Sequence, residues 1–241
     1  MREFDPAEIR VVACDIFGTT VDWRTGVADQ VARIAADHGL SLDGGAFADA
    51  WRDRYLPSLR RVNRGERDWA PLDTLHRESL DELLDERGAG SAFDDAARRR
   101  LVHAWHRLPA WADAVAGLAR LRRRFVVTTL SNGGFALLTT LVKAAGLPFD
   151  CIVSAELARA YKPAPRAYLT AAELLDVEPG QVLLVAAHRW DIDGARDAGL
   201  ATAFLERPLE KGPGRTADRA ADVAADLSVT GFDHLAGVLG C

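Results

Sequence analysis

Two aspartates and a lysine, widely separated in the sequence, could together carry out nucleophilic catalysis. Asp15 directly follows an apolar run at 9–14, Lys162 precedes a proline, and Asp191 lies near the start of a helical pattern. An ionised carboxylate can attack a substrate and form a covalent ester, and a nearby ammonium group keeps that carboxylate ionised. The alternative is that Asp15 only caps the turn or helix that follows it, and this stretch alone favours neither interpretation.

The sequence predicts that these side chains meet at one edge of a parallel β-sheet. Short apolar runs alternate with helical patterns, which is typical of a doubly wound α/β fold. The runs lie at 9–14, 125–130, 151–154, 182–185 and 200–205. Ligands bind outside the carboxyl ends of such strands. The polar groups expected there are Asp15, Thr19, Ser131, Asn132, Lys162, His188 and Asp191.

A long stretch after the first strand contains no strand-like run. Apolar residues recur at helical spacing from about 27 to 107, and glycines interrupt them, so we expect four or five helices. Both ends of this insert attach at the same edge of the sheet. We therefore predict two domains: an α/β core of residues 1–22 and 108–241, and a helical cap of residues 23–107.

The composition argues against several classes of protein. The 241-residue chain is 49% hydrophobic with a formal net charge of −5, so it can bury a large core but has no basic excess for nucleic acid. No apolar run approaches the roughly 20 residues of a membrane span, and the N-terminus lacks the apolar core of a signal peptide. The three cysteines match no metal-binding spacing. We therefore expect a reduced, cytoplasmic protein that binds neither nucleic acid nor membranes.

Taken in order, four motifs resemble those of the haloacid dehalogenase-like hydrolase superfamily, over essentially the whole chain. They are Asp-Ile-Phe-Gly-Thr at 15–19, Leu-Ser-Asn-Gly at 130–133, Tyr-Lys-Pro at 161–163 and Trp-Asp at 190–191. The resemblance implies the Rossmann-like core of that superfamily. It also implies that the insert is the superfamily's smaller type of cap.

Most members of that superfamily are magnesium-dependent phosphatases, and this sequence departs from them at two places. Phosphatases carry a second acid two residues after the nucleophile, where this chain has Phe17. They also tend to have an acidic pair in the fourth motif, where this chain has Ala186, Ala187 and His188 before Asp191. A hard divalent cation prefers several carboxylate oxygens. We therefore expect no metal and no other cofactor.

The same positions resemble the type II L-2-haloacid dehalogenases. These enzymes have an aromatic residue at the position of Phe17, an arginine after a tryptophan in the second cap helix, as in Trp51-Arg52, and a tyrosine six residues after the motif lysine, as at Tyr168. The resemblance implies hydrolysis of short 2-haloacids to 2-hydroxyacids, with L-selectivity and inversion, and fluoroacetate is a further candidate substrate. Relatives of this type are often dimers, so a homodimer is one expected state.

The resemblance implies a mechanism in which Asp15 displaces the halide and becomes an ester. Lys162 keeps Asp15 ionised, and Asp191 positions or deprotonates the water that attacks the ester. Arg52 pairs with the halide or the substrate carboxylate. The residues expected to bind substrate are Thr19, Phe17, Arg52, Ser131, Asn132, Tyr168 and Trp190, among which Tyr168 is expected as a pocket wall and Ser131 has the alternative of capping the next helix.

The fourth motif departs from the dehalogenases, because Ala186 and His188 stand where Ser and Asn are usual. His188 could donate a hydrogen bond to departing fluoride or assist the water as a base. The alternative is a neutral imidazole that fills the space of the missing amide and makes one hydrogen bond. The other histidines, at 38, 76, 103, 106 and 234, have no partner at a useful spacing, so we expect them at the surface.

Two other functions remain open at the level of the sequence. The first is a magnesium-dependent phosphatase or a phosphonoacetaldehyde hydrolase of the same fold, although the cap region contains no lysine. The second is a non-catalytic binding protein. Retention of Asp15, Lys162 and Asp191 together argues against it, because buried charges without a use are costly.

Overall fold

A computed structural model, which describes residues 4–241, contains one six-stranded sheet in which all neighbouring strands are parallel. The strand order is β3-β2-β1-β4-β5-β6. The strands are β1 (Val11–Cys14), β2 (Val126–Ser131), β3 (Cys151–Ser154), β4 (Val182–Ala186), β5 (Ala201–Leu205) and β6 (Leu227–Val229). The first five match the predicted runs. β6 was not predicted, because three residues are too few to carry a strand pattern.

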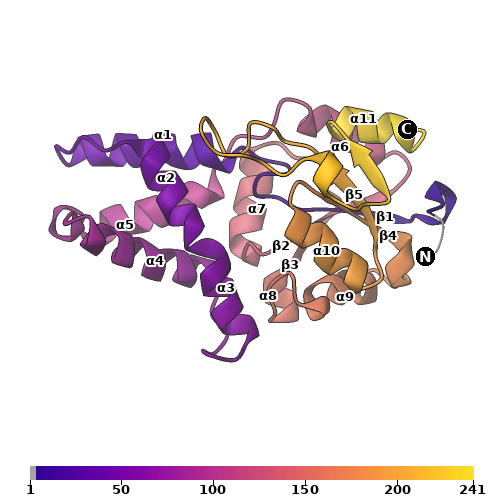
Figure 1. Cartoon of the computed structure of the whole chain (residues 1–241), viewed down its shortest axis with the longest axis horizontal. Helices are drawn as coiled ribbons and strands as arrows, with labels where there is room; N and C mark the ends of the chain where they lie inside the picture. The colour runs from indigo at the N-terminus through magenta and orange to yellow at the C-terminus, as the bar shows by residue number, and fades with distance from the viewer. Residues whose placement is uncertain (1–3) are drawn as a thin grey trace.

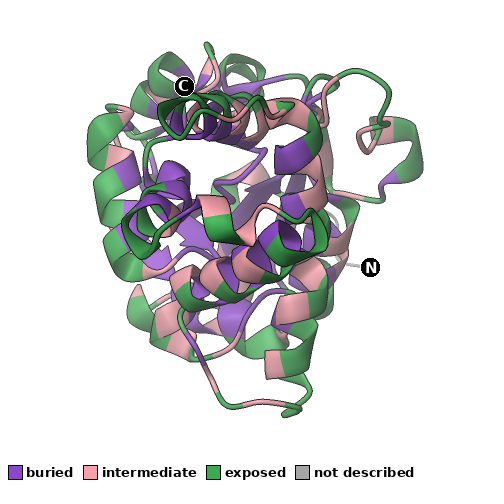
Figure 2. Ribbon diagram, turned by 90° about the vertical axis from the view of Figure 1, so that its left-hand side faces the viewer, coloured by how far each residue is buried: buried purple, intermediate pink, exposed green. Residues whose placement is uncertain are grey.

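Helices cover both faces of the sheet, which confirms the predicted doubly wound α/β fold (Figure 1). Side chains alternate along β1, so Val12 and Cys14 pack in one core cluster whereas Val11 and Ala13 pack in the other. The first cluster includes α6 (Ala114–Leu121), α7 (Phe135–Ala144) and α11 (Phe232–Val238). The second includes α9 (Pro165–Leu174) and α10 (Arg189–Asp197), and the short helix α8 (Ala155–Ala158) follows β3. Figure 2 shows the buried strands at the centre of the molecule.

The insert between β1 and β2 is entirely helical and forms the left-hand part of Figure 1. Its helices are α1 (Trp23–Asp37), α2 (Gly44–Asp53), α3 (Tyr55–Asn63), α4 (Leu72–Glu86) and α5 (Asp95–Val102), followed by the short 3₁₀ helix η3 (His103–His106). Five α-helices lie within the predicted number. Among residues 4–241, no helix combines the length and the apolar character needed to cross a membrane.

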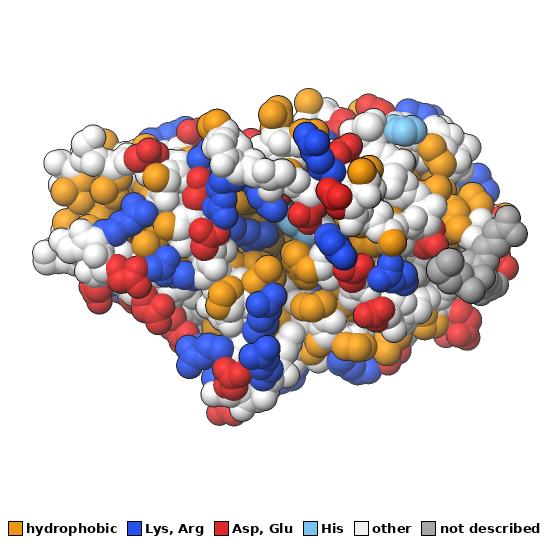
Figure 3. Space-filling view, in the orientation of Figure 1, with side chains coloured by type: hydrophobic (Ala, Val, Ile, Leu, Met, Phe, Trp, Pro, Cys, Tyr) orange, Lys and Arg blue, Asp and Glu red, His pale blue; other side chains and the backbone are white. Residues whose placement is uncertain are grey.

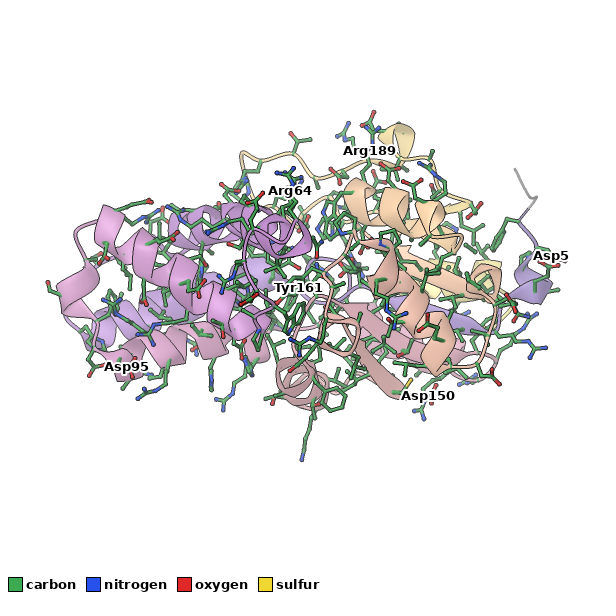
Figure 4. All side chains as sticks on the ribbon, turned by 90° about the horizontal axis from the view of Figure 1, so that it is seen from below. Asp5, Arg64, Asp95, Asp150, Tyr161 and Arg189 are labelled. Carbon is green, nitrogen blue, oxygen red and sulfur yellow. The ribbon has the colours of Figure 1, made fainter. Side chains whose placement is uncertain are left out.

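The insert contacts the sheet part of the chain through α3 and the segment that follows α8. Asn63 Nδ2 donates to the Tyr161 carbonyl (2.8 Å), and the Tyr161 N–H donates back to Asn63 Oδ1 (3.0 Å). The Tyr161 hydroxyl donates to the Ala70 carbonyl (2.7 Å). Figure 4 shows Tyr161 between the two parts, with Asp95 and Asp5 near opposite ends of the molecule. These contacts fix the insert next to the segment that carries Lys162.

Candidate active site

Asp15 lies at the point where the direction of chain connection in the sheet reverses. The sheet extends from β1 to β2 and β3 on one side and to β4, β5 and β6 on the other, so the ends of β1 and β4 border a crevice. Within it, Asp15 Oδ1 accepts from Lys162 Nζ (3.0 Å) and Oδ2 accepts from the Thr19 hydroxyl (2.8 Å). The Asp15 carbonyl accepts from the Thr20 hydroxyl (2.7 Å). The buried carboxylate is therefore held in one orientation, with both oxygens engaged.

Lys162 joins the two predicted catalytic carboxylates. Its ammonium group also donates to Asp191 Oδ2 (2.5 Å), and Asp191 Oδ1 accepts from the Tyr168 hydroxyl (2.8 Å). The backbone of Lys162 is fixed by Asn132, whose Oδ1 accepts from its N–H (2.7 Å) and whose Nδ2 donates to its carbonyl (3.3 Å). Lys162, Asp191 and Tyr168 are all at most 1% exposed. Together with Thr19, five predicted site residues thus form one connected hydrogen-bond network with Asp15.

The pKa values of the two carboxyl groups shift in opposite directions. Burial alone would raise the pKa of Asp15, but the Lys162 ammonium and His188 outweigh it and hold that pKa below its ordinary value. Burial raises the pKa of Asp191 above its ordinary value despite the attraction of Lys162. The two carboxylates in turn raise the pKa of Lys162. Asp15 is therefore ionised, as a nucleophile must be, and Asp191 is the more basic of the two.

His188 lies between two acidic side chains. Its Nδ1 is 3.5 Å from Asp15 Oδ2, and its Nε2 is 3.0 Å from Glu210 Oε1. Burial alone would lower the pKa of His188, but Glu210 and Asp15 outweigh it and raise the pKa to about 10. The Trp190 ring stacks on the imidazole, with 5.7 Å between ring centroids. His188 makes one side-chain hydrogen bond, to Glu210, and its buried Nδ1 has no hydrogen-bond partner among residues 4–241. Both the donor role and the neutral imidazole therefore stay predictions at this point.

Arg52 reaches the site from α2 through a group of aromatic rings. Its guanidinium carbon is 4.1 Å from the Tyr55 ring centroid, 5.2 Å from that of Trp23 and 6.0 Å from that of Phe17. The Nη1 atom is buried and has no hydrogen-bond partner among residues 4–241. Aromatic faces attract a guanidinium but leave its N–H groups free to donate. Arg52 can therefore offer an unused donor to an anion.

A cavity of about 250 Å³ opens between the insert and the sheet part. Its lining includes three predicted residues, Arg52, His188 and Trp190, together with Trp23 and Glu210. Figure 3 shows Lys and Arg side chains gathered along the junction between the two parts of the molecule. The cavity lining therefore combines basic side chains, aromatic rings and three acidic side chains, contributed by both parts of the molecule.

The remaining predicted residues lie behind this cavity rather than along its lining. The Tyr168 hydroxyl donates to Asp191, and Tyr168 does not belong to the lining of this cavity, so its expected role as a pocket wall stays a prediction. Ser131 Oγ accepts from the Gly133 N–H (3.2 Å), which is a turn contact before α7. Phe17 is buried with its ring edge-on to Trp105. A second cavity, of about 20 Å³, borders Lys162 and is large enough for one water molecule.

The sequence pattern did not reveal Glu210 or the aromatic partners Trp23 and Tyr55. Glu210 follows β5, where no motif draws attention to an acid, and its partners are distant in sequence: His188 and Trp23, whose Nε1 donates to it (2.7 Å). The expectation that the other histidines lie at the surface is wrong for two of them. His76 packs against Trp105, and His106 Nε2 contacts Asp73 Oδ2 (2.9 Å). Helical spacing alone did not separate these buried positions from exposed ones.

The donor set of this site does not fit a divalent cation. Each oxygen of Asp15 and Asp191 already accepts from a neutral hydroxyl or from Lys162, whose ammonium occupies the space between them. Among residues 4–241, no group of three or more His, Cys, Asp or Glu side chains is arranged to hold a metal ion. A hard cation needs several free oxygen ligands. The residues thus disfavour a phosphatase-type magnesium site.

Comparison with known proteins shows the family to which this chain is similar. The family model of the haloacid dehalogenase-like hydrolases matches residues 9–199. (S)-2-haloacid dehalogenase 1 from Pseudomonas sp. (strain CBS-3) is 32% identical over 203 residues, which cover 83% of this chain and 85% of that protein.

Two solved structures resemble the whole chain. The crystal structure of a defluorinating L-2-haloacid dehalogenase superimposes with a TM-score of 0.93 at 45% identity, covering 97% of this chain and 96% of that one. The L-2-haloacid dehalogenase from Xanthobacter autotrophicus, with chloropropionic acid covalently bound, gives a TM-score of 0.82 at 27% identity, covering 96% and 98%. The predicted resemblance to this family is therefore confirmed.

Proposed function

Because the chain belongs to the haloacid dehalogenase-like hydrolases, we propose that it hydrolyses short 2-haloacids to 2-hydroxyacids through an ester of Asp15. It is a hydrolase that acts on carbon–halide bonds. The observation that carries the mechanism is the buried, ionised Asp15 carboxylate, held by Lys162 and Thr19 at the end of β1. No second acid stands beside it, since Phe17 occupies the position where a phosphatase has its proton donor.

In the first step, one Asp15 oxygen attacks the substrate α-carbon from the side opposite the halogen. The carbon–oxygen bond forms as the carbon–halogen bond breaks, and the halide leaves with the bonding electron pair. Arg52, whose Nη1 has no partner among residues 4–241, donates to the halide or to the substrate carboxylate. The product of this step is an alkyl ester of Asp15.

In the second step, water attacks the carbonyl carbon of that ester. Asp191, the more basic carboxylate, accepts the proton of the water, and Lys162 stabilises the negative charge that develops on the carbonyl oxygen. The bond between the carbonyl carbon and the ester oxygen then breaks. The leaving oxygen takes the proton from Asp191 to become the hydroxyl of the 2-hydroxyacid, and the remaining proton of the attacking water is released to solvent, which restores the Asp15 carboxylate. The small cavity beside Lys162 supports this role, because it has room for one water.

The proposal also covers the domain organisation, the assembly and one further substrate. Residues 23–107 form a cap domain over the core of residues 1–22 and 108–241, supported by the cavity between the two parts. The enzyme works in the cytoplasm, and as a homodimer, with a 2-haloacid and a halide as its ligands. Fluoroacetate is among its substrates, supported by the similarity to a defluorinating enzyme and by Arg52 and His188, two donors in the cavity lining.

Halide release measured in the presence of EDTA tests the proposal. We expect L-2-chloropropionate, chloroacetate and fluoroacetate to lose halide in EDTA, and Asp15→Asn to abolish that release. A phosphate-ester assay with magnesium runs beside it. Phosphate release that needs magnesium, with no halide release, would contradict the proposal and favour the phosphatase alternative. Inactivity in both assays would favour a binding protein.

A further inference from the structure

We propose that Glu210 is a positioning residue that keeps His188 doubly protonated, so that His188 acts as a fixed cationic hydrogen-bond donor and not as a base. This inference rests on the proposed function of the cavity that both side chains line. It assigns a role to an acid outside the four family motifs. Of the two catalytic roles considered for His188, it favours donation to the departing halide over deprotonation of the water.

The positions of the two ring nitrogens carry the inference. Nε2 is 3.0 Å from Glu210 Oε1, within hydrogen-bond distance, and Nδ1 is 3.5 Å from Asp15 Oδ2, so an anion lies near each nitrogen. The buried Nδ1 makes no hydrogen bond within residues 4–241. A neutral imidazole has only one N–H and would present a lone pair to one of these carboxylates. The imidazolium presents an N–H to both. His188 and Glu210 are 5% and 2% exposed, so water does not replace these partners.

Glu210 is itself fixed by its surroundings. Its Oε1 also accepts from Trp23 Nε1 (2.7 Å). Gly18, in the loop after Asp15, has φ +91°, and a Cβ at that position would lie 2.6 Å from Glu210 Oε1. The glycine of the first motif therefore leaves the space that the Glu210 carboxylate occupies. The Glu210 carboxylate is therefore held in one position by Trp23 and by the backbone at Gly18.

The charges that face His188 balance when it is an imidazolium. Asp15 extends from the end of β1 and Glu210 from the loop after β5, whereas Arg52 approaches from α2 and Lys162 lies beyond Asp15 with Asp191. Two buried cations, Lys162 and the His188 imidazolium, and the half-buried Arg52 then accompany three buried carboxylates, which limits the cost of burying them. The charged groups at the outer rim of the cavity are Asp53, Lys211, Arg215 and Asp218. Burial alone would raise the pKa of Glu210, but the attraction of His188 outweighs it and lowers this pKa to about 2, which is consistent with the balance of charges.

A fixed imidazolium changes what His188 can do in the reaction. With a proton on each nitrogen, it has no lone pair to accept a proton from water, which leaves that role to Asp191. Its Nδ1 is buried, has no hydrogen-bond partner among residues 4–241 and belongs to a side chain that lines the cavity, so the Nδ1–H can donate to the halide of a bound substrate. Fluoride is the poorest leaving group among the halides and needs the strongest donation. Loss of Glu210 should therefore slow defluorination more than dechlorination.

The first test is independent of turnover. Imidazole ¹⁵N and ¹H signals of the full-length protein are followed against pH, and His188→Asn identifies the His188 signals. We expect wild-type His188 to remain an imidazolium from about pH 6 to pH 9, and Glu210→Gln to lower its titration midpoint by about 1–3 pH units. Glu173→Gln is the matched control, because Glu173 is an exposed acid paired with Arg166. A wild-type His188 that titrates near pH 6.5, or a Glu210→Gln midpoint equal to that of wild type, would overturn the inference.

The second test measures kcat and KM against pH for fluoroacetate and L-2-chloropropionate. In Glu210→Gln we expect a new loss of kcat as pH rises through the lowered midpoint, with defluorination reduced on the order of 10–100-fold more than dechlorination. Glu210→Asp, which keeps the charge, should restore part of the wild-type profile. A uniform, pH-independent loss would mean that Glu210 has only a structural role. If the wild type releases no halide at all, the proposed function fails, while the titration still decides the inference.

Discussion

At the scale of single residues, the site consists of buried acidic groups that are each paired with a buried cation. Lys162 donates to both Asp15 and Asp191, so one ammonium group links the proposed nucleophile to the proposed base. His188 and Glu210 form a second pair on the cavity side. Each pair is buried, and removing one partner would leave an uncompensated charge.

The pH dependence of the His188–Glu210 pair follows from its two pKa shifts. The raised pKa of His188 gives a contribution to stability that is complete below its ordinary value of 6.5 and is lost as pH rises towards about 10. The lowered pKa of Glu210 gives one that is complete above 4.5 and is lost as pH falls towards about 2. We expect the coupling free energy in a double-mutant cycle of His188→Asn and Glu210→Gln to be largest between these ordinary values. Urea unfolding at a series of pH values measures it, and a coupling that does not vary with pH would contradict the ion pair.

Tyr168→Phe tests the second contact of Asp191. The substitution removes the hydroxyl that donates to Asp191 Oδ1 and leaves the ring in place. Because hydrogen bonds to charged groups contribute more than neutral ones, we expect the free energy of unfolding to fall by about 1–3 kcal/mol. Since Tyr168 lies behind Asp191 and not along the cavity, kcat should fall while KM changes little. A change confined to KM would show that Tyr168 contacts substrate after all.

At the scale of elements, the loop after β5 decides where Glu210 lies. Arg207 in that loop donates through Nε to the Thr19 carbonyl (3.0 Å) and through both Nη atoms to Asp113 (2.8 and 3.1 Å). Asp113 Oδ2 also accepts from the Phe232 N–H at the start of α11 (2.7 Å). The loop is thus fastened to the nucleophile loop and to two helices of the core.

Arg207→Met should weaken this attachment. The side chain of Arg207 is only 9% exposed, so we expect the free energy of unfolding to fall by about 2–4 kcal/mol and defluorination to decline as Glu210 moves. Arg166→Met is the control, because its pair with Glu173 is more than half exposed and should contribute within about 0.5 kcal/mol. Chemical denaturation of the two variants gives the comparison. Equal effects of the two substitutions would argue against a structural role for the Arg207 contacts.

The strands and the motif residues could be predicted from the sequence, because burial on both faces of a parallel sheet leaves continuous apolar runs. Topology then required Asp15 and Asp191 to meet at one edge. Glu210 could not be predicted in this way, since its position depends on a loop fixed by Arg207 and on space left by Gly18. The burial of His76 depends on packing against aromatic rings of other segments, which helical spacing does not encode.

At the scale of the whole molecule, the cavity exists only because the helical insert lies against the sheet part. Its lining combines Arg52 from α2 with His188 and Glu210 from the core. Ion pairs also cross the junction, as between Arg215 and Asp53 (2.6 Å). The cavity, of about 250 Å³, has room for a short 2-haloacid.

The chemistry of the cavity lining predicts a preference for short substrates. We expect kcat/KM to fall along the series 2-chloropropionate, 2-chlorobutyrate and 2-chlorohexanoate, because a longer apolar chain must extend towards the charged side chains of the lining, such as Arg215 and Asp218. Leu56→Ala, which enlarges the cavity lining without touching a charged group, should recover part of the rate on the longest acid. Halide release measures both effects. An unchanged kcat/KM along the series would mean that the cavity does not enclose the substrate.

Oxygen-18 labelling of Asp15 tests the central claim most directly. If an Asp15 ester forms and water attacks its carbonyl carbon, turnover in ¹⁸O-water places the label in the Asp15 carboxylate, and a single turnover gives a hydroxyacid whose new oxygen is unlabelled. Mass spectrometry of the peptide that contains Asp15, and of the product, reads out both predictions. A labelled product after one turnover, with an unlabelled Asp15, would show that water attacks the substrate directly and would contradict the account.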